Sequence, residues 1–320
     1  MGKDDLASLR KVYPTMFLLS DDPLEVEAVS SGSIALDYAL GVGGFPRGRI
    51  SEIFGPESSG KTTLVYSTLV NAQRDNDKWV AFVDVEHVFD PEYAKNIGLN
   101  EERMVLFQPD FGEQALTFAK DCLESGHFSG VAVDSVAALV PKAELEGEIG
   151  DVHVGRQARM MSQTLRKITG AVRESQAVML FTNQLRTKIG GYGNPETTPG
   201  GKALPYYASV RVRLSVTSTK AAAESSGRVT VRAQVNKNKV APPYKRAEFD
   251  IQFGSGIDRI NDVFQYARMT DVIEVRGGSY YYGEESLGRG KDVVLSLIGE
   301  DVAGWEQRIK DTLLKAGDDY

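Results

Sequence analysis

Hydrophobic residues follow two different patterns along this chain. Between about residues 29 and 183, short continuous apolar runs alternate with longer segments in which apolar residues recur at helical spacing. Continuous runs are typical of strands buried on both faces of a parallel sheet, and the helical segments predict helices that cover those faces. We therefore predict a doubly wound α/β core with a mostly parallel, twisted sheet. Its predicted strands are ISEIF (50–54), WVAFVDV (79–85), MVLF (104–107), GVAVD (130–134) and AVMLFT (177–182), and its longest helices lie within 61–75, 112–125 and 156–175.

Farther along the chain the pattern changes to strict alternation of apolar and polar residues, in VRVRLSV (210–216) and VTVRAQV (229–235). Alternation predicts antiparallel strands that extend the sheet and keep one face in water. The polar segment TSTKAAAESSG (217–227) between them is predicted to be a mobile hairpin connection.

The two ends of the chain differ from this core, which we place at 29–258. Residues 1–28 form a polar leader with a short helical pattern that stops at Pro14. Residues 259–320 contain a hairpin pattern in YYYGEESLGRGK and an amphipathic helical pattern from about Trp305 to Leu314. We predict a small α+β C-terminal domain there.

Composition narrows the class of protein. The chain has 320 residues, a net charge of −7 and one cysteine, Cys122, which excludes an internal disulfide framework and fits a reducing compartment. The start lacks the apolar core of a signal peptide, and no apolar run approaches a membrane span, so we expect a cytoplasmic protein without a membrane partner. The net charge weighs only slightly against nucleic acid, because a local basic surface on an acidic protein still binds phosphates.

The segment GPESSGKT (55–62) follows a predicted strand and opens a predicted helix, which is the setting of a phosphate-binding P-loop. Backbone N–H groups of such a loop surround the phosphates, and the helix N-terminus adds a favourable partial charge. Lys61 is expected to reach the β- and γ-phosphates of ATP, and the Thr62 hydroxyl is expected to bind Mg²⁺. The predicted nucleotide-binding residues of this segment are Gly55, Pro56, Glu57, Ser58, Ser59, Gly60, Lys61, Thr62 and Thr63.

Carboxylates stand where two parallel strands end, at the edge of the sheet where ligands bind, and a tyrosine follows just beyond one of them. Asp134 ends GVAVD and is the expected second metal residue, although an aspartate there can also cap the next helix. Glu86, near the end of WVAFVDVEH (79–87), is the expected residue that activates water for hydrolysis. Asp84 competes for that role but lies deeper in its strand. Tyr93 is either a core residue or a platform for adenine.

Several longer segments closely resemble the RecA family of recombinases: GPESSGKTTL, VDVEH, FDPEYAKNIG, VDSVAALVPKAELEGEIGD, ARMMSQTLRKI, NQLRTKIG, GNPETTPGGKAL, KNKVAPPY and FGSGI. The resemblance runs in order from about residue 28 to the end and is thinner after 258. It implies an ATP-dependent DNA recombinase that forms helical filaments on single-stranded DNA and exchanges strands with homologous duplex DNA. The leader would then be a short oligomerisation segment.

The resemblance also implies roles for individual residues in ATP hydrolysis. Glu86 matches the family's water-activating glutamate, and Gln184 matches the glutamine that senses the γ-phosphate. Lys237 and Lys239 match cations that a neighbouring subunit points at ATP, although NKNK after an alternating strand otherwise indicates a solvated turn. The residues that match the family's adenine contacts are Asp90 and Tyr93.

Two segments resemble the DNA-binding loops of the family, at about 146–156 and 184–202. Cations there would neutralise phosphates, glycine N–H groups would bind others, and Ile189 would wedge between stacked bases. On chemistry alone, the arginines of the helix after the first loop are a solvated face. The predicted DNA-binding residues are Arg159, Ser162, Arg166, Arg186, Thr187, Lys188, Ile189, Gly200 and Gly201.

Some features depart from the family pattern. Ile260 replaces an aromatic residue that helps to cover the neighbouring subunit's nucleotide, so we expect looser packing of ATP there. The leader is shorter than the family's N-terminal helix, which bears on filament cooperativity. The long acidic C-terminal tail is absent, so we expect less inhibition of duplex binding.

Two other functions are alternatives. A hexameric DNA helicase on the same core would carry an N-terminal partner domain and an arginine finger, and the chain shows neither pattern. A DNA-dependent regulatory ATPase that uses ATP only as a clamp would not need the glutamate and the interface cations.

Overall fold

The structure of the protein is a computed structural model that describes residues 8–9, 11–13, 26–74, 77–148, 155–187 and 196–316. The described part of the leader agrees with its predicted helical pattern, because residues 8–9 and 11–12 are helical and Tyr13 N donates to the Leu9 carbonyl at 2.8 Å. Among the residues described, no helix is both long enough and apolar enough to cross a membrane.

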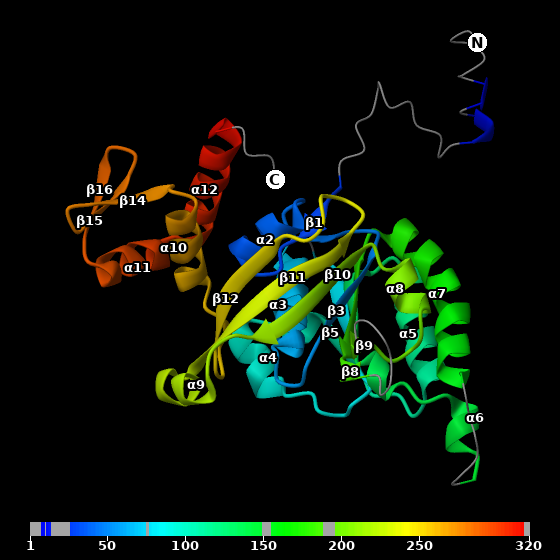
Figure 1. Ribbon diagram of the computed structural model, residues 1–320. Helices are drawn as coiled ribbons and strands as arrows, with labels where there is room; N and C mark the ends of the chain where they lie inside the picture. The colour runs from blue at the N-terminus through cyan, green and yellow to red at the C-terminus, as the bar shows by residue number, and fades with distance from the viewer. Residues whose placement is uncertain are drawn as a thin grey trace.

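A nine-stranded twisted sheet forms the centre of the molecule, in the order β13-β12-β11-β10-β3-β7-β6-β4-β5 (Figure 1). The strands predicted from continuous apolar runs are all present and pair in parallel. Their bounds are β3 Ile50–Gly55, β4 Trp79–Asp84, β5 Met104–Phe107, β6 Phe128–Asp134 and β7 Val178–Gln184.

The alternating segments form β10 (Val210–Val216) and β11 (Arg228–Asn238), and β12 (Arg246–Gln252) and β13 (Gly256–Ile257) follow them. The prediction of antiparallel strands that extend the sheet is confirmed for β10 with β11 and for β11 with β12. On its other side β10 runs parallel to β3, so the strand direction changes between β10 and β11.

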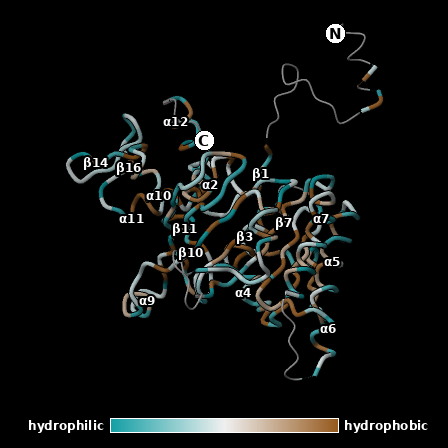
Figure 2. The backbone as a smooth tube through the Cα atoms, turned by 45° about the vertical axis from the view of Figure 1, so that its right-hand side comes forward, coloured by the Kyte–Doolittle hydropathy of each residue, from teal (hydrophilic) through white to brown (hydrophobic). Residues whose placement is uncertain are grey.

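Helices cover both faces of the sheet, because side chains of each central strand alternate between two buried clusters. In β3, Ile53 belongs to the cluster shared with α2 and α3, and Ile50 belongs to the one shared with α5 and α7. The most hydrophobic stretches of the chain lie around these central strands (Figure 2). One face carries α2 (Ile34–Leu40), α3 (Lys61–Arg74) and α4 (Pro91–Ile97), and the other carries α5 (Gly112–Glu124), α7 (Arg156–Ser175) and α8 (Ala203–Tyr207).

The segment predicted to be a mobile hairpin connection is instead partly helical, which corrects that prediction. α9 spans Lys220–Ser226, and the Thr219 hydroxyl at its N-cap accepts from Ala222 N at 3.3 Å. Gly227 ends the helix with a left-handed φ of 67°. A threonine cap, three alanines and a terminal glycine are all local helix signals, so the sequence contained the evidence for this helix.

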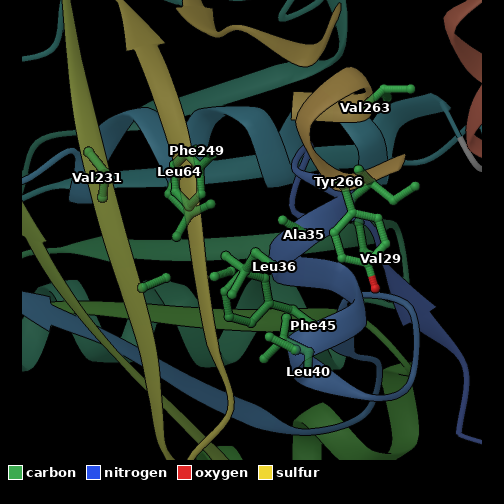
Figure 3. Close-up of a cluster of buried hydrophobic side chains, with 14 of the residues drawn as sticks. Val29, Ala35, Leu36, Leu40, Phe45, Leu64, Val231, Phe249, Val263 and Tyr266 are labelled. Carbon is green, nitrogen blue, oxygen red and sulfur yellow. The ribbon is translucent and has the colours of Figure 1, made fainter. Parts of the chain in front are cut away.

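The C-terminal part adds its own three-stranded sheet and three helices, in agreement with the predicted α+β character. The predicted hairpin is present as β15 and β16, and the predicted amphipathic helix is α12. Tyr266 of the first of these helices lies beside Ala35 of α2, so this part shares a buried cluster with the core (Figure 3). The elements are α10 (Arg259–Met269), β14 (Ile273–Arg276), β15 (Ser279–Tyr282), β16 (Glu285–Arg289), α11 (Lys291–Glu300) and α12 (Val302–Ala316).

A buried carboxyl group at this junction makes stability depend on pH. Burial raises the pKa of Asp262 to about 8, although the Ser33 hydroxyl and the first amides of α2 oppose the rise. Asp37, nearby and also buried, has a pKa of about 6. The folded protein keeps a proton on Asp262 that the unfolded chain, with a carboxyl pKa of about 3.9, releases. The proton on Asp262 therefore favours the folded state. The free energy of unfolding that it contributes is greatest below about pH 4 and is lost as the pH rises to 8.

We expect Asp262→Asn to remove that dependence, because asparagine stays neutral. Between pH 6 and 8 the wild-type protein should lose on the order of 1 kcal/mol per pH unit relative to the variant. Urea unfolding at several pH values measures the difference, with Asp311→Asn at an exposed position of α12 as the control. Parallel curves for the wild type and Asp262→Asn would contradict this assignment.

Candidate active site

The P-loop occupies the turn between the end of β3 and the start of α3. Gly60 has a left-handed φ of +85°, and a Cβ there would lie 2.4 Å from Ile251 Cδ1, so only glycine fits. Lys61 Nζ donates to the Pro56 carbonyl at 2.7 Å. Burial lowers the pKa of Lys61, although the Asp134, Glu86 and Glu57 carboxylates oppose that change.

A hollow of about 320 Å³ opens beside this loop. Tyr93 lines it and its hydroxyl is 2.7 Å from Thr63 Oγ1, which fits a platform held in place by the P-loop helix. Asp90 is not among the lining residues; it caps α4 and accepts from Tyr93 N at 3.0 Å. The lining consists of Ser58, Ser59, Gly60, Lys61, Thr62, Thr63, Tyr93, Val229, Ile251, Phe253 and Gly254.

Phe253 is a lining residue that the sequence reasoning missed. Its side chain is 54 % exposed although it is a large aromatic residue, and it follows β12 directly. Its place in the FGSGI segment was the available signal. Ile260 lies in a separate hollow with Asn261 and Lys291, so the aromatic wall of the nucleotide hollow in this subunit comes from Phe253 and Tyr93.

Asp134 and Thr62, the two residues of the predicted metal site, meet at the edge of the sheet. Thr62 Oγ1 donates to Asp134 Oδ2 at 2.7 Å, and Thr182 donates to the other carboxylate oxygen. Burial raises the pKa of Asp134, while the two threonine hydroxyls oppose the rise. The carboxylate does not cap a helix through a side-chain hydrogen bond; its partners are these hydroxyls.

Glu86 lies at the same edge, and two side chains hold its Oε1. The Ser135 hydroxyl donates to it, and Gln184 Nε2 donates at 3.3 Å. Asp84, the competing carboxylate, is 1 % exposed and accepts from Val88 N and Phe89 N, so it shapes the loop that carries Glu86. Ser135, which follows β6, and Gln184, which ends β7, therefore meet at the Glu86 carboxylate.

The two lysines expected to act on a neighbour's nucleotide lie away from this cluster. Lys237 pairs with Arg211 of β10, which in turn pairs with Glu52 near the start of β3. Lys237 Nζ donates to the Tyr206 carbonyl at 3.0 Å, at the end of α8. Burial, Lys239 and Arg211 lower the pKa of Lys237 to about 8. The NKN segment continues β11 and is not a turn.

The predicted DNA-binding residues gather around α7 and the second loop. Arg159 and Arg166 are exposed and stand two turns apart on one face of α7, with half-buried Ser162 between them. Arg186 is exposed in β8 (Arg186–Thr187), which pairs with β9 (Glu196–Thr197) at the base of the second loop. Gly200 is buried and Gly201 is exposed; Lys188 and Ile189 lie outside the described residues.

Known proteins resemble this chain over most of its length. The model of the RecA N-terminal domain family matches residues 9–258. Protein RecA of Chlorobaculum parvum is 50% identical over 302 residues, covering 92% of this chain and 86% of the relative. Protein RecA of Clostridium acetobutylicum is 49% identical over 288 residues, covering 90% and 82%.

The chain belongs to the RecA family. The crystal structure of the RadB recombinase also resembles it, with a TM-score of 0.55 and 25% sequence identity, and the match covers 72% of this chain and 98% of that chain. As a RecA-family recombinase, the protein is a DNA-dependent ATPase that couples ATP hydrolysis to strand exchange. The helicase and regulatory ATPase alternatives are not favoured.

Proposed function

We propose that this chain forms helical filaments on single-stranded DNA with ATP between subunits, and pairs that strand with homologous duplex DNA in the cytoplasm. The observation that supports this best is the placement of Gln184, which donates from the end of β7 to Glu86, the proposed general base, and is also the first residue of the proposed second DNA loop. One side chain therefore stands between the hydrolysis site and the DNA-binding segment.

In the proposed reaction, Glu86 accepts a proton from water as the water oxygen bonds to the γ-phosphorus of ATP. The bond from that phosphorus to the bridging oxygen breaks, and ADP leaves. Lys61 stabilises the charge on the phosphates, and Lys237 and Lys239 of a neighbouring subunit add positive charge from the other side. Loss of the γ-phosphate frees Gln184, so the second loop weakens its hold on DNA.

The residues present also fit Mg²⁺. The described residues hold no cluster of His, Cys, Asp and Glu able to bind a metal without help. A threonine hydroxyl 2.7 Å from a carboxylate is the small oxygen set that Mg²⁺ uses when phosphates and waters complete its shell. Thr62 and Asp134 would hold the ion, which would neutralise phosphate charge when bound.

For DNA, we propose that Arg159, Arg166, Arg186 and Lys188 neutralise phosphates, and that Gly200 and Gly201 contribute backbone N–H groups. Such contacts carry no sequence information, which suits a protein that accepts any DNA. Ser162 and Thr187 would add hydroxyl contacts to the backbone, and Ile189 would separate groups of stacked bases.

ATP hydrolysis with and without single-stranded DNA tests the proposal, followed by electron microscopy with a non-hydrolysable ATP analogue. We expect DNA to stimulate hydrolysis and helical filaments to form, and Lys61→Ala to lose hydrolysis while it keeps its fold. Closed rings would favour a helicase. An ATP hydrolysis rate that is the same with and without single-stranded DNA would exclude the proposed coupling.

A further inference from the structure

The side chain of Gln157 joins three segments of the chain at the start of α7. Its Nε2 donates to the Val136 and Leu139 carbonyls, both at 2.9 Å, in the turn that follows Asp134. Its Oε1 accepts from Gly200 N at 3.1 Å. The carboxamide thereby links the strand end of the active site to the stem of the second DNA loop.

The stem of that loop packs closely against the same two segments. Gly200 has a φ of +84°, and a Cβ there would lie 2.8 Å from Val136 Cγ1. Gly201 has a φ of +74°, and a Cβ there would lie 2.8 Å from Ala158 Cβ. The contact between Gln157 and Gly200 is therefore part of a closely packed surface.

This contact competes with the proposed use of Gly200. A backbone N–H has one hydrogen to donate, and in this structure Gly200 donates it to Gln157 Oε1. A DNA phosphate can reach that hydrogen only if the carboxamide oxygen leaves. The exchange is favourable, because a charged phosphate oxygen accepts a stronger hydrogen bond than a neutral amide oxygen does.

We propose that Gln157 is an internal competitor for DNA: its side-chain oxygen occupies the phosphate position at Gly200 N–H until DNA displaces it. The inference rests on the proposed phosphate contact of Gly200. Competition by Gln157 weakens the binding of single-stranded DNA. When DNA displaces the Gln157 oxygen, the amide nitrogen of the same side chain stays on the turn after Asp134. Binding of DNA at Gly200 thus changes the contacts of a side chain that lies beside the active site.

Two substitutions separate this role from a purely structural one. Gln157→Ala removes the competing oxygen, so we expect a Kd for labelled oligothymidylate without nucleotide that is about five-fold lower, the factor of one neutral hydrogen bond. Gln157→Glu keeps an acceptor and adds negative charge, so we expect weaker binding. A side chain that only supports the loop would weaken binding in both variants.

Further variants keep the experiment decisive. Gln157→Met fills the same space without an amide, and should also bind more tightly if the alanine variant folds poorly. Glu174→Ala, at an exposed position near the other end of α7, is the matched control. Hydrogen exchange at the Gly200 amide should be faster in Gln157→Met than in the wild type.

The possible failures are distinguishable. If Arg186→Ala binds single-stranded DNA as well as the wild type, the proposed DNA role of the second loop is wrong. If Arg186→Ala weakens binding while Gln157→Ala and Gln157→Met bind no more tightly than the wild type, only the competitor is wrong.

Discussion

Replacing Glu86 with glutamine is expected to slow DNA-stimulated ATP hydrolysis by on the order of 10²–10⁴-fold, the usual contribution of a general base. Glutamine keeps the oxygen that accepts from Ser135 and has nearly the same shape, so the edge of the sheet should stay intact. It cannot accept a proton from water, however. The turnover number should fall, while binding of a non-hydrolysable ATP analogue should be nearly unchanged.

Glu92→Gln provides the matched control, because Glu92 is an exposed glutamate on the neighbouring helix α4. Filaments on single-stranded DNA should persist in Glu86→Gln and dissociate more slowly, since hydrolysis drives their release in the proposed cycle. A turnover number for Glu86→Gln close to that of the wild type would remove Glu86 from the chemical step.

The second large effect concerns a buried ion pair that joins β3 to β10. The Glu52 side chain is fully buried, and Arg211 Nε donates to its Oε2 while Asn183 Nδ2 donates to Oε1 at 3.1 Å. The Arg211 guanidinium also lies 4.5 Å from the centre of the Phe54 ring. Arg211→Met should cost about 3–5 kcal/mol of unfolding free energy, because it leaves the Glu52 charge buried without its cation.

Urea unfolding measures this loss of unfolding free energy, and two further variants show whether it comes from the buried charge. Arg232→Met breaks the pair with Glu248, whose side chains are 46% and 49% exposed, and should cost at most about 1 kcal/mol. Adding Glu52→Leu to Arg211→Met should recover part of the loss, because an apolar pair does not leave a buried charge. Equal losses for Arg211→Met and Arg232→Met would show that burial does not decide the energy here.

The same ion pair bears on the proposed second DNA loop. Asn183 Nδ2, besides its contact with Glu52, donates to the Pro199 carbonyl at 3.1 Å, which fastens the far end of that loop to the end of β7. Gln157 fastens the next residue from the other side. The loop between β7 and α8 therefore has a stem anchored by two carboxamide side chains.

Local patterns were sufficient for most of the fold. Continuous apolar runs predicted all five central parallel strands, since a strand buried on both faces needs apolar residues on both. The P-loop was also readable, because its glycines, Lys61 and Thr62 are adjacent in sequence and the strand and helix around them fix their geometry. α9 also carries local signals, a capping Thr219 and a terminal Gly227, although its polar composition is that of a loop.

By itself, then, the sequence determined the α/β core, the loop between β3 and α3 that matches a P-loop, the carboxylates beside the strand ends and the family. Tertiary structure alone decided which distant residues meet: Arg211 on Glu52, Phe253 opposite the P-loop, and Gln157 on Gly200. It also decided that β10 pairs in parallel with β3. The physical reason is that a periodic pattern reports only which side of an element is buried, whereas partners far apart along the chain are chosen by the packing of whole elements against one another.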